Sequence, residues 1–191
     1  MNLRRGFKAE ANELARELRR ELSLNLEDPL DPTMLAEHLE IPITTLSAMK
    51  DDAPFAAQQF SVKDPTVFSA VTVFYGHQRK IVHNDSHHPV RQASNLAHEL
   101  SHALLHHRPT PALDEFGNRL WNQTVEDEAT WLGGALLISE EAALHIVRNG
   151  WSRAQAARYY QVSEEMVIFR LNMTGAQKRL RWGFRARRQR E

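Results

Sequence analysis

The stretch NLAHELSHALLHH, residues 95–107, places three ionisable side chains inside a run rich in alanine and leucine. His98 and His102 are four residues apart, and Glu99 directly follows the first histidine. Alanine and leucine are typical of a helix that packs against a core, but burying three unpaired ionisable groups there would be costly. We therefore expect either that this polar face meets solvent or that the three side chains surround a metal ion.

The spacing of the two histidines favours the metal ion. Residues four apart lie on one face of an α-helix, so His98 and His102 can direct their ring nitrogens at one point. Glu99 lies about 100° further round the helix, too far to bind the ion well but close enough to reach a water molecule beside it. Two histidine ligands and a glutamate base are the division of labour in H-E-x-x-H zinc hydrolases. The stretch thus predicts a Zn²⁺ site with Glu99 as the catalytic base.

A third protein ligand must come from elsewhere in the chain. The metzincin continuation of the motif needs a glycine and a later histidine where Leu105 and Arg108 stand, so that class is excluded. The segment TVEDEATWLGGALLIS offers Glu126 and Glu128, which are about 200° apart on a helical wheel, so only one of them can face the ion. Glu126 is favoured because it shares its face with Gly133, whose small size permits close helix packing. Glu128 stays open as the alternative ligand, as an acid that supports the site, or as a surface residue.

The other histidines are weaker candidates for the site. His106 continues the stripe but lies two helical turns, roughly 12 Å, beyond His98 along the axis, so it cannot share an ion with both motif histidines. We expect His106 and His107 to be exposed residues at the rim and His77 to lie in a turn. The weak candidates that precede the motif are His83, His87 and His88.

The bulk composition indicates one globular domain of ordinary size. The chain has 191 residues, of which 42% are hydrophobic and 25% charged, and its formal net charge is zero. It contains no cysteine, which excludes disulfides and thiolate metal sites. We see neither a secretory signal nor a run of about 18 apolar residues that could cross a membrane, and we expect a cytoplasmic protein without a membrane partner.

Basic residues gather in residues 178–191. This segment carries a single acidic residue, Glu191, against seven basic ones: Lys178, Arg179, Arg181, Arg185, Arg187, Arg188 and Arg190. The rest of the chain is therefore net acidic. Such a tail can bind nucleic acid weakly, rest against the acidic body or extend into solvent, and we favour the last two.

Hydrophobic periodicity and capping residues predict a mostly helical α+β fold with one small antiparallel sheet. The expected helices cover 7–23, 32–39, the motif stretch, 124–138, 140–150 and two short segments capped by Ser152 and Ser163. A strand is expected within 41–49 and a β-hairpin over 67–83 with Gly76 at its turn, while 51–66 and 108–116 are expected to be loops. The predicted units are N-terminal helices in 1–50, a core with the metal site in 51–150, a helix–turn–helix-like packing segment in 151–177 and a flexible basic tail in 178–191.

Several of these segments together resemble the ImmA/IrrE-type zinc metallopeptidases. The resemblance rests on FSAVTVF, RKIVHND, RQASNLAHELSHALLHH and EDEATWLGGALLIS, and it covers roughly residues 66–175. It implies a zincin-like core in which the zinc ligands are His98, His102 and Glu126 and the catalytic base is Glu99. The sequence departs from the family pattern at Ser139, where proline is common, and at Gly133 and Gly134, where larger residues are frequent.

The resemblance also implies a reaction and a partner. Enzymes of this kind cut helix–turn–helix repressors or antitoxin-like proteins and so release a stress or mobile-element response. We therefore expect a zinc endopeptidase whose protein substrate is such a repressor or antitoxin. Glu99 would take a proton from the attacking water and pass it to the leaving amine. The candidates to stabilise the oxyanion are Arg91, Tyr159, Tyr160 and one of the remaining histidines.

A hypothesis from a different class is a DNA-binding or zinc-sensing regulator that cuts nothing. Residues 152–171 have the length and pattern of two short helices joined by a tight turn. The second helix opens with Glu164 and Glu165, however, and two acids at the start of a recognition helix would face phosphates badly. A packing role is favoured, and it predicts buried positions at Val162, Val167 and Leu171. A zinc sensor would use the same ligands as the enzyme, so the sequence leaves that alternative open.

Overall fold

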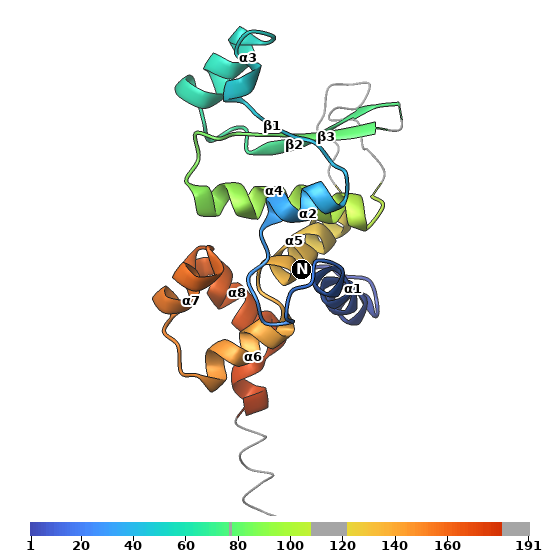
Figure 1. Ribbon diagram of the computed structural model, residues 1–191, viewed down its shortest axis with the longest axis vertical. Helices are drawn as coiled ribbons and strands as arrows, with labels where there is room; N and C mark the ends of the chain where they lie inside the picture. The colour runs from blue at the N-terminus through green and yellow to red at the C-terminus, as the bar shows by residue number, and fades with distance from the viewer. Residues whose placement is uncertain (77, 108–121, 181–191) are drawn as a thin grey trace, which may run out of the picture.

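In the computed structural model of the chain, the described residues are 1–76, 78–107 and 122–180. The elements are α1 Phe7–Glu21, α2 Pro32–His38, β1 Ile43–Thr45, the 3₁₀ turn η1 Ser47–Met49, α3 Pro54–Gln58, the π-helical turn η2 Gln59–Lys63, β2 Ala70–Tyr75, β3 Gln78–His83, α4 Pro89–Leu104, α5 Gln123–Leu137, α6 Glu140–Arg148, α7 Arg153–Tyr160 and α8 Glu164–Thr174. Figure 1 shows the sheet lying above α4, with α5 below α4 and the helices α6 to α8 furthest from the sheet. The mostly helical α+β fold is confirmed.

The sheet has the strand order β1-β3-β2, so β2 lies at an edge. β2 and β3 form the predicted antiparallel hairpin, in which Ala70 is opposite His83 and Gly76 occupies the turn with a φ of 60°. β1 runs parallel to β3, with Ile43 opposite Ile81. The prediction of an antiparallel sheet is therefore correct for the hairpin and wrong for β1. Parallel partners are joined by long crossovers, and short-range sequence patterns do not reveal them.

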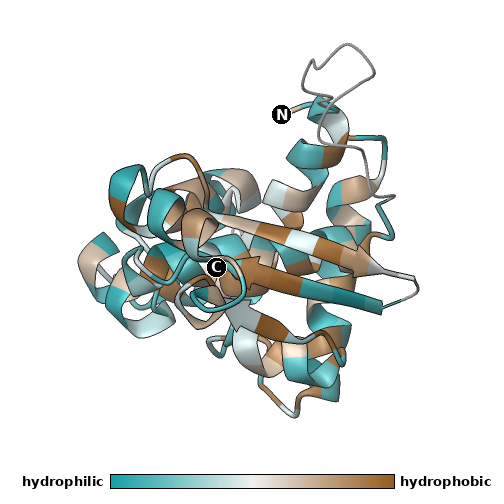
Figure 2. Cartoon of the chain, turned by 90° about the horizontal axis from the view of Figure 1, so that it is seen from above, coloured by the Kyte–Doolittle hydropathy of each residue, from teal (hydrophilic) through white to brown (hydrophobic). Residues whose placement is uncertain are grey.

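The sheet and α4 share one core with the N-terminal helices. Ile81 on β3, Leu100 on α4 and Leu132 on α5 are fully buried together with Phe7 on α1 and Leu35 on α2. Seen from above in Figure 2, hydrophobic stretches run along the strands across the middle of the view, and β3 begins with a hydrophilic stretch. This core fixes the position of α4 between the sheet on one side and α5 on the other.

A second hydrophobic cluster holds the C-terminal helices on the end of α5. It contains Ile138, Ile146, Val162 and Val167, with Leu171 partly buried against it. The predicted core positions of this segment are thus confirmed for the two valines and correct in direction for Leu171. α8 contacts α5, α6 and α7, which is the arrangement expected of a packing helix.

Most predicted helix starts are confirmed by their caps. The Asp31 carboxylate accepts a hydrogen bond from the Thr33 amide, and the side chains of Ser139 and Ser163 cap α6 and α8. Ser152 and Gln155 form the predicted capping box at α7. Within the described part of the chain, no helix combines the length and the apolar composition that crossing a bilayer requires.

The predicted loop at 51–66 is wrong, because α3 and η2 occupy most of it. Pro54 stands in the first turn of α3, where proline is tolerated. The Asn84 amide at the end of β3 donates to the carbonyls of Phe60 at 2.7 Å and Phe68 at 3.1 Å, which ties η2 to the sheet. These partners are far apart in the sequence, so local patterning did not reveal the turn. The predicted loop at 108–116 and most of the basic tail lie outside the described residues.

Candidate metal centre

The motif helix α4 begins where the sequence favours a helix start. Pro89 occupies its first turn, and the His88 ring accepts a hydrogen bond from the Val90 amide at 3.4 Å. The apolar face of α4 is buried, with Leu96 and Leu100 in the core. The opposite face is half-buried and carries the motif histidines.

Three predicted ligands meet between α4 and α5. The His98 Nε2 atom lies 3.0 Å from the His102 Nε2 atom and 3.2 Å from a carboxylate oxygen of Glu126. The same oxygen lies 3.6 Å from the Nε2 atom of His102. One ligand atom from each residue falls within a mutual distance of 4.8 Å, and among the described residues no other group of three or more His, Asp or Glu satisfies this condition. Two imidazole nitrogens and one carboxylate oxygen are a donor set that suits zinc.

The charge of Glu126 is matched to this position. Contacts with His102 and His98 hold the pKa of the Glu126 carboxyl well below its ordinary value, although partial burial acts in the opposite direction. Glu126 is also in the first turn of α5, where the helix dipole favours a negative charge. The side chain is therefore an anionic oxygen donor at neutral pH.

Gly133 brings the two ligand helices together. A Cβ atom at this position would lie 3.2 Å from the Ala97 carbonyl oxygen and 3.3 Å from the His98 backbone nitrogen. Backbone atoms cannot move aside as the end of a side chain can. The close approach predicted on the Glu126 face therefore occurs at Gly133, next to the first motif histidine.

Glu99 points to the sheet. One of its carboxylate oxygens accepts a hydrogen bond from the Thr72 hydroxyl at 2.6 Å. Thr72 is on the edge strand β2 and pairs with the fully buried Ile81, so it faces α4. Sequence reasoning missed Thr72, although its alternation with the exposed Val71 and Val73 placed it on the inner face of the hairpin.

His107 and Glu128 differ from expectation. The His107 side chain is 10% exposed and its Nδ1 atom lies 2.9 Å from the His102 Nδ1 atom, so the prediction of an exposed residue is wrong. Burial, assisted by His102, lowers the pKa of the His107 imidazole. The His107 Nε2 atom lies 3.6 Å from an oxygen of Glu128, whose side chain is 8% exposed. Glu128 is therefore a buried acid behind the ligands, whereas His106 is exposed as predicted.

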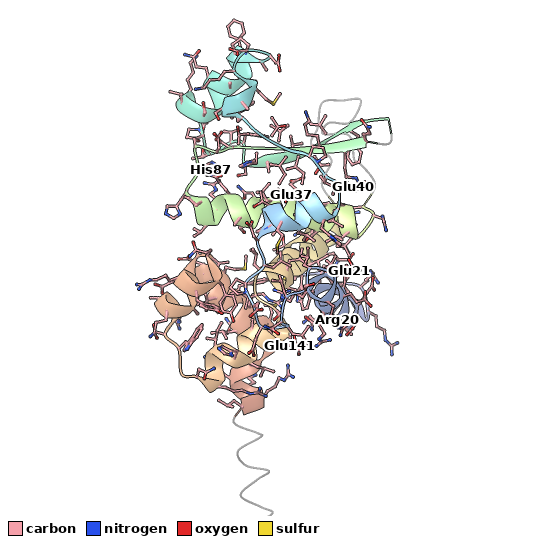
Figure 3. All side chains as sticks on the ribbon, in the orientation of Figure 1. Arg20, Glu21, Glu37, Glu40, His87 and Glu141 are labelled. Atoms are coloured by element: carbon pink, nitrogen blue, oxygen red, sulfur yellow. The ribbon has the colours of Figure 1, made fainter. Side chains whose placement is uncertain are left out.

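The remaining candidate histidines lie away from the three ligands. His87 is at the start of α4, as Figure 3 shows, and its Nε2 atom contacts the Pro65 carbonyl at 2.7 Å. His83 is buried at the end of β3, where burial lowers the pKa of its imidazole. His88 caps α4, and His77 lies outside the described residues.

The oxyanion candidates are also placed. The Tyr160 hydroxyl donates to the Glu27 carbonyl at 2.9 Å, and the residue belongs to the second hydrophobic cluster, so its hydroxyl is already engaged. Tyr159 stacks edge-on against Trp151 in the same region. The Arg91 guanidinium donates to the Ser69 hydroxyl at 3.1 Å. None of these three contacts the ligand group.

A cavity of about 1120 Å³ lies elsewhere, around the edge of the sheet formed by β1. Its walls include Leu39, Met49, Lys80 and His106, and neither the three ligands nor Glu99 line it. The converging donors, rather than the cavity, therefore define the candidate site.

Comparison with known proteins agrees with this geometry. The family model Peptidase_M78, described as the IrrE N-terminal-like domain, matches residues 36–172. The matched region runs from α2 into α8 and includes all three ligand candidates and Glu99. No curated protein matches the chain.

Proposed function

The chain belongs to the Peptidase_M78 family and is a metallopeptidase, and we propose that it is a zinc-dependent endopeptidase acting on a specific protein partner. The convergence of His98, His102 and Glu126, with Glu99 one residue beyond the first ligand, carries the proposal. The donor set fits zinc, since two neutral imidazoles and one carboxylate leave a fourth position open for water or substrate. When bound, zinc would polarise the scissile carbonyl and make water more acidic.

Glu99 supplies the proton transfer in this proposal. Its oxygen bonded to Thr72 is held by the edge strand, which leaves the other oxygen to take a proton from the attacking water. The same carboxyl group then delivers that proton to the leaving amine, as a general base that becomes a general acid. The hydrogen bond from Thr72 fixes the rotamer of Glu99. It thereby limits the positions in which the attacking water can meet the other carboxylate oxygen.

The exposed edge of β2 supports an extended peptide as substrate. Among the described residues β2 pairs only with β3, and Val71 and Val73 on its outer face are 43% and 48% exposed. An extended peptide can add to such an edge as a further strand, with main-chain hydrogen bonds giving affinity and side-chain contacts giving specificity. The peptide would then lie beside Thr72 and its partner Glu99. We propose that the partner is a helix–turn–helix repressor or antitoxin, which the family resemblance implies.

The substitution Glu99→Gln tests the enzyme. The amide cannot take up a proton, so cleavage of a helix–turn–helix protein encoded beside this chain should fall by at least about 100-fold. Zinc content and thermal unfolding should match the wild type, because Glu99 is not a ligand in this proposal. An unrelated unfolded protein serves as the control substrate and should be cut slowly by both forms.

Two results would contradict the proposal. Cleavage by Glu99→Gln at the wild-type rate would remove Glu99 as the base. Tight zinc binding by the wild type without cleavage of any candidate repressor would favour the zinc-sensing alternative.

A further inference from the structure

The two motif histidines differ in what lies behind them. The outer nitrogen of His98, Nδ1, lies 3.5 Å from the hydroxyl of Thr130, an exposed residue. The corresponding nitrogen of His102 lies 2.9 Å from the Nδ1 atom of the nearly enclosed His107. Only His102 therefore has a close and buried hydrogen-bond partner on the side away from the ligand group.

The end of α4 explains how His107 reaches this position. His106 has a φ of 52°, which turns the chain back after the helix. The His107 amide donates to the His102 carbonyl at 3.0 Å, and the His106 amide donates to the Ala103 carbonyl at 3.1 Å. These two bonds define a Schellman motif, which sets the side chain after the left-handed residue against the residue three positions from the helix end. That contact is frequently hydrophobic, but here it joins two imidazoles.

The contact continues to a buried charge and then to the N-terminal segment. The His107 Nε2 atom faces Glu128 at 3.6 Å, and the other oxygen of Glu128 lies 3.2 Å from the Arg4 Nε atom. The Arg4 amide also donates to that oxygen at 3.4 Å. Arg4 gives Glu128 a partner in a place where an unpaired carboxylate would be costly. A line of polar groups thus runs from His102 through His107 and Glu128 to Arg4.

The direction of the protons along this line follows from the hydrogen-bond inventory. A neutral imidazole has one donor nitrogen and one acceptor nitrogen. If the His102 Nε2 atom is to bind an ion, its proton must be on Nδ1, and it must donate to the Nδ1 atom of His107. His107 then carries its own proton on Nε2, where it faces the anionic Glu128. This single assignment of tautomers places a donor opposite an acceptor at each contact from His102 to Glu128.

We propose that His107 is a positioning residue that, with Glu128, holds His102 in the tautomer and ring orientation that bind zinc. This inference rests on the proposed metal site, since it concerns how one of its ligands is prepared. It also predicts that His102 already has the ligand tautomer in the zinc-free protein. Partners behind a metal-binding histidine typically change metal affinity by about 10- to 100-fold.

Matched asparagine and alanine variants test the proposal. His107→Ala removes the acceptor, and His107→Asn keeps an acceptor oxygen near the position of Nδ1 but loses the contact with Glu128. His106→Asn is the control, because it makes the same replacement one residue earlier, at an exposed left-handed position that asparagine tolerates. Zinc affinity is measured by competition with a chelator. The tautomer of His102 is measured separately in the zinc-free protein by nitrogen NMR.

The expected result is a graded loss. The zinc Kd should rise about 10- to 100-fold for His107→Ala and less for His107→Asn, and it should not change for His106→Asn. The zinc-free wild type should show the His102 proton on Nδ1, and His107→Ala should lose that preference while its circular dichroism stays native. His107→Ala binding zinc as tightly as the wild type would overturn the proposal. So would a His102 proton on Nε2 in the zinc-free wild type.

The two measurements separate this inference from the proposed function. A wild type that binds no zinc would refute the zinc endopeptidase. The NMR experiment would still decide whether His107 sets the tautomer of His102. A wild type that binds zinc and cleaves its partner, with His107→Ala unchanged in affinity and tautomer, would refute only the role of His107.

Discussion

The two ends of α5 are both rich in charge, but only one is arranged for chemistry. At its N-terminal end, Glu126 contacts the partly exposed side chains of His98 and His102, and Glu128 pairs with Arg4 behind them. At its C-terminal end, Arg19 and Arg170 are completely buried. Acids at the start and cations at the end both complement the helix dipole. Helix electrostatics alone therefore does not distinguish a site from a structural contact.

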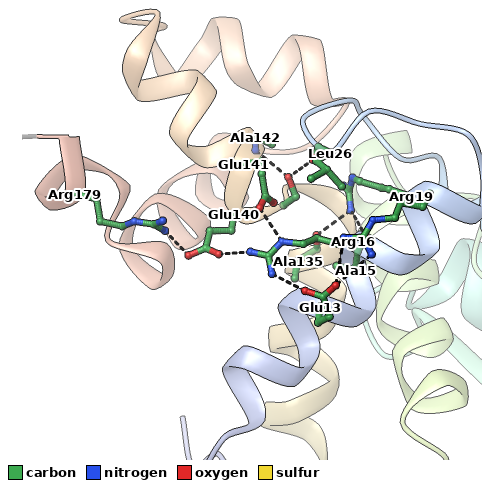
Figure 4. A network of polar contacts seen from close by, with 12 residues as sticks. Glu13, Ala15, Arg16, Arg19, Leu26, Ala135, Glu140, Glu141, Ala142 and Arg179 are labelled. Carbon is green, nitrogen blue, oxygen red and sulfur yellow. Dashed lines mark hydrogen bonds and ion pairs between the residues drawn. The ribbon is translucent and has the colours of Figure 1, made fainter. Parts of the chain in front are cut away.

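At the C-terminal end, the charged side chains bind the last carbonyl groups of the helix. Arg19 donates to the Leu136 carbonyl at 2.6 Å, and Arg170 donates from Nε to the Ile138 carbonyl at 2.8 Å. Figure 4 shows Arg19 reaching the end of α5 beside the network of Arg16 with Glu140 and Glu141. Burial lowers the pKa of Arg170 to about 9, which still leaves it charged at neutral pH.

The difference between the ends is in what the charged groups face. Each arginine donates to a carbonyl oxygen at the end of the helix. The acids of the first turn face side chains from α4 and the N-terminal segment, and the three ligand atoms converge on one point. The candidate site is distinguished by ligand atoms that come from two helices and converge at a partly exposed position. The following predictions test this contrast.

Replacing Glu126, the ligand candidate in the first turn of α5, should have the largest effect. Glu126→Gln replaces an anionic oxygen donor by a weak neutral one, so zinc affinity and peptidase activity should each fall by at least about 100-fold. The zinc-free protein should also unfold more easily at neutral pH, because the contacts with His102 and His98 that lower the pKa of the Glu126 carboxyl stabilise the folded state. Asp127→Asn, which alters the next acid of the same helix outside the ligand group, should bind zinc normally. Equal losses in both variants would mean that the charge of the helix end matters and the convergence does not.

The second prediction concerns the opposite end of α5. Arg170→Ala should lower the free energy of unfolding by about 2–4 kcal/mol, because it leaves the Ile138 carbonyl without its donor and opens a cavity beside Trp131. Arg170→Met should cost less. It fills the space and removes a buried charge whose two terminal nitrogens have no hydrogen-bond partner among the described residues. Denaturant titration measures both, and zinc affinity should be unchanged.

The convergence of the three ligand candidates was predictable from the sequence because its information is local. The four-residue spacing placed His98 and His102 on one face, and the helical wheel separated Glu126 from Glu128. The position of His107 was not predictable in the same way. Its burial depends on the left-handed conformation of His106, and the sequence offers no glycine there to indicate where the helix ends. His107, which we expected to be exposed at the rim, is folded back against His102 by the turn.

Contacts between distant segments account for the other errors. The parallel pairing of β1 with β3 and the bonds from Asn84 to η2 join residues that no periodic pattern connects. Thr72 is intermediate, because alternation along the hairpin indicates its face and only the packing of the sheet on α4 identifies Glu99 as its partner. Spacing within each helix thus indicated which side chains could converge, whereas the contacts of His107 and Thr72 needed the tertiary structure.

The third prediction uses the neighbouring glycines of α5. A Cβ atom at Gly133 would press on the α4 backbone, and one at Gly134 would lie 2.9 Å from side-chain atoms of Phe169 and Arg170 on α8. Either alanine substitution should destabilise the fold by up to about 2 kcal/mol, since strain exceeds the gain in helix propensity. Only Gly133→Ala should weaken zinc binding, by up to about 10-fold, because it displaces α5 from His98. Equal zinc affinities in the two variants would contradict this prediction. They would mean that the spacing between α4 and α5 does not determine the geometry of the ligand candidates.

The smallest expected effect is at Tyr160, beside the buried end of α5. Its hydroxyl donates to the Glu27 carbonyl, and burial raises the pKa of the phenol, so it stays neutral. Tyr160→Phe removes one hydrogen bond and should lower the free energy of unfolding by about 1 kcal/mol. Peptidase activity, corrected for the folded fraction, should not change. The hydroxyl is already engaged away from the ligand candidates. A large loss of activity in a fully folded Tyr160→Phe variant would therefore contradict this prediction and make Tyr160 an oxyanion donor again. The C-terminal end of α5, to which we assign a role in stability, would then also take part in the reaction.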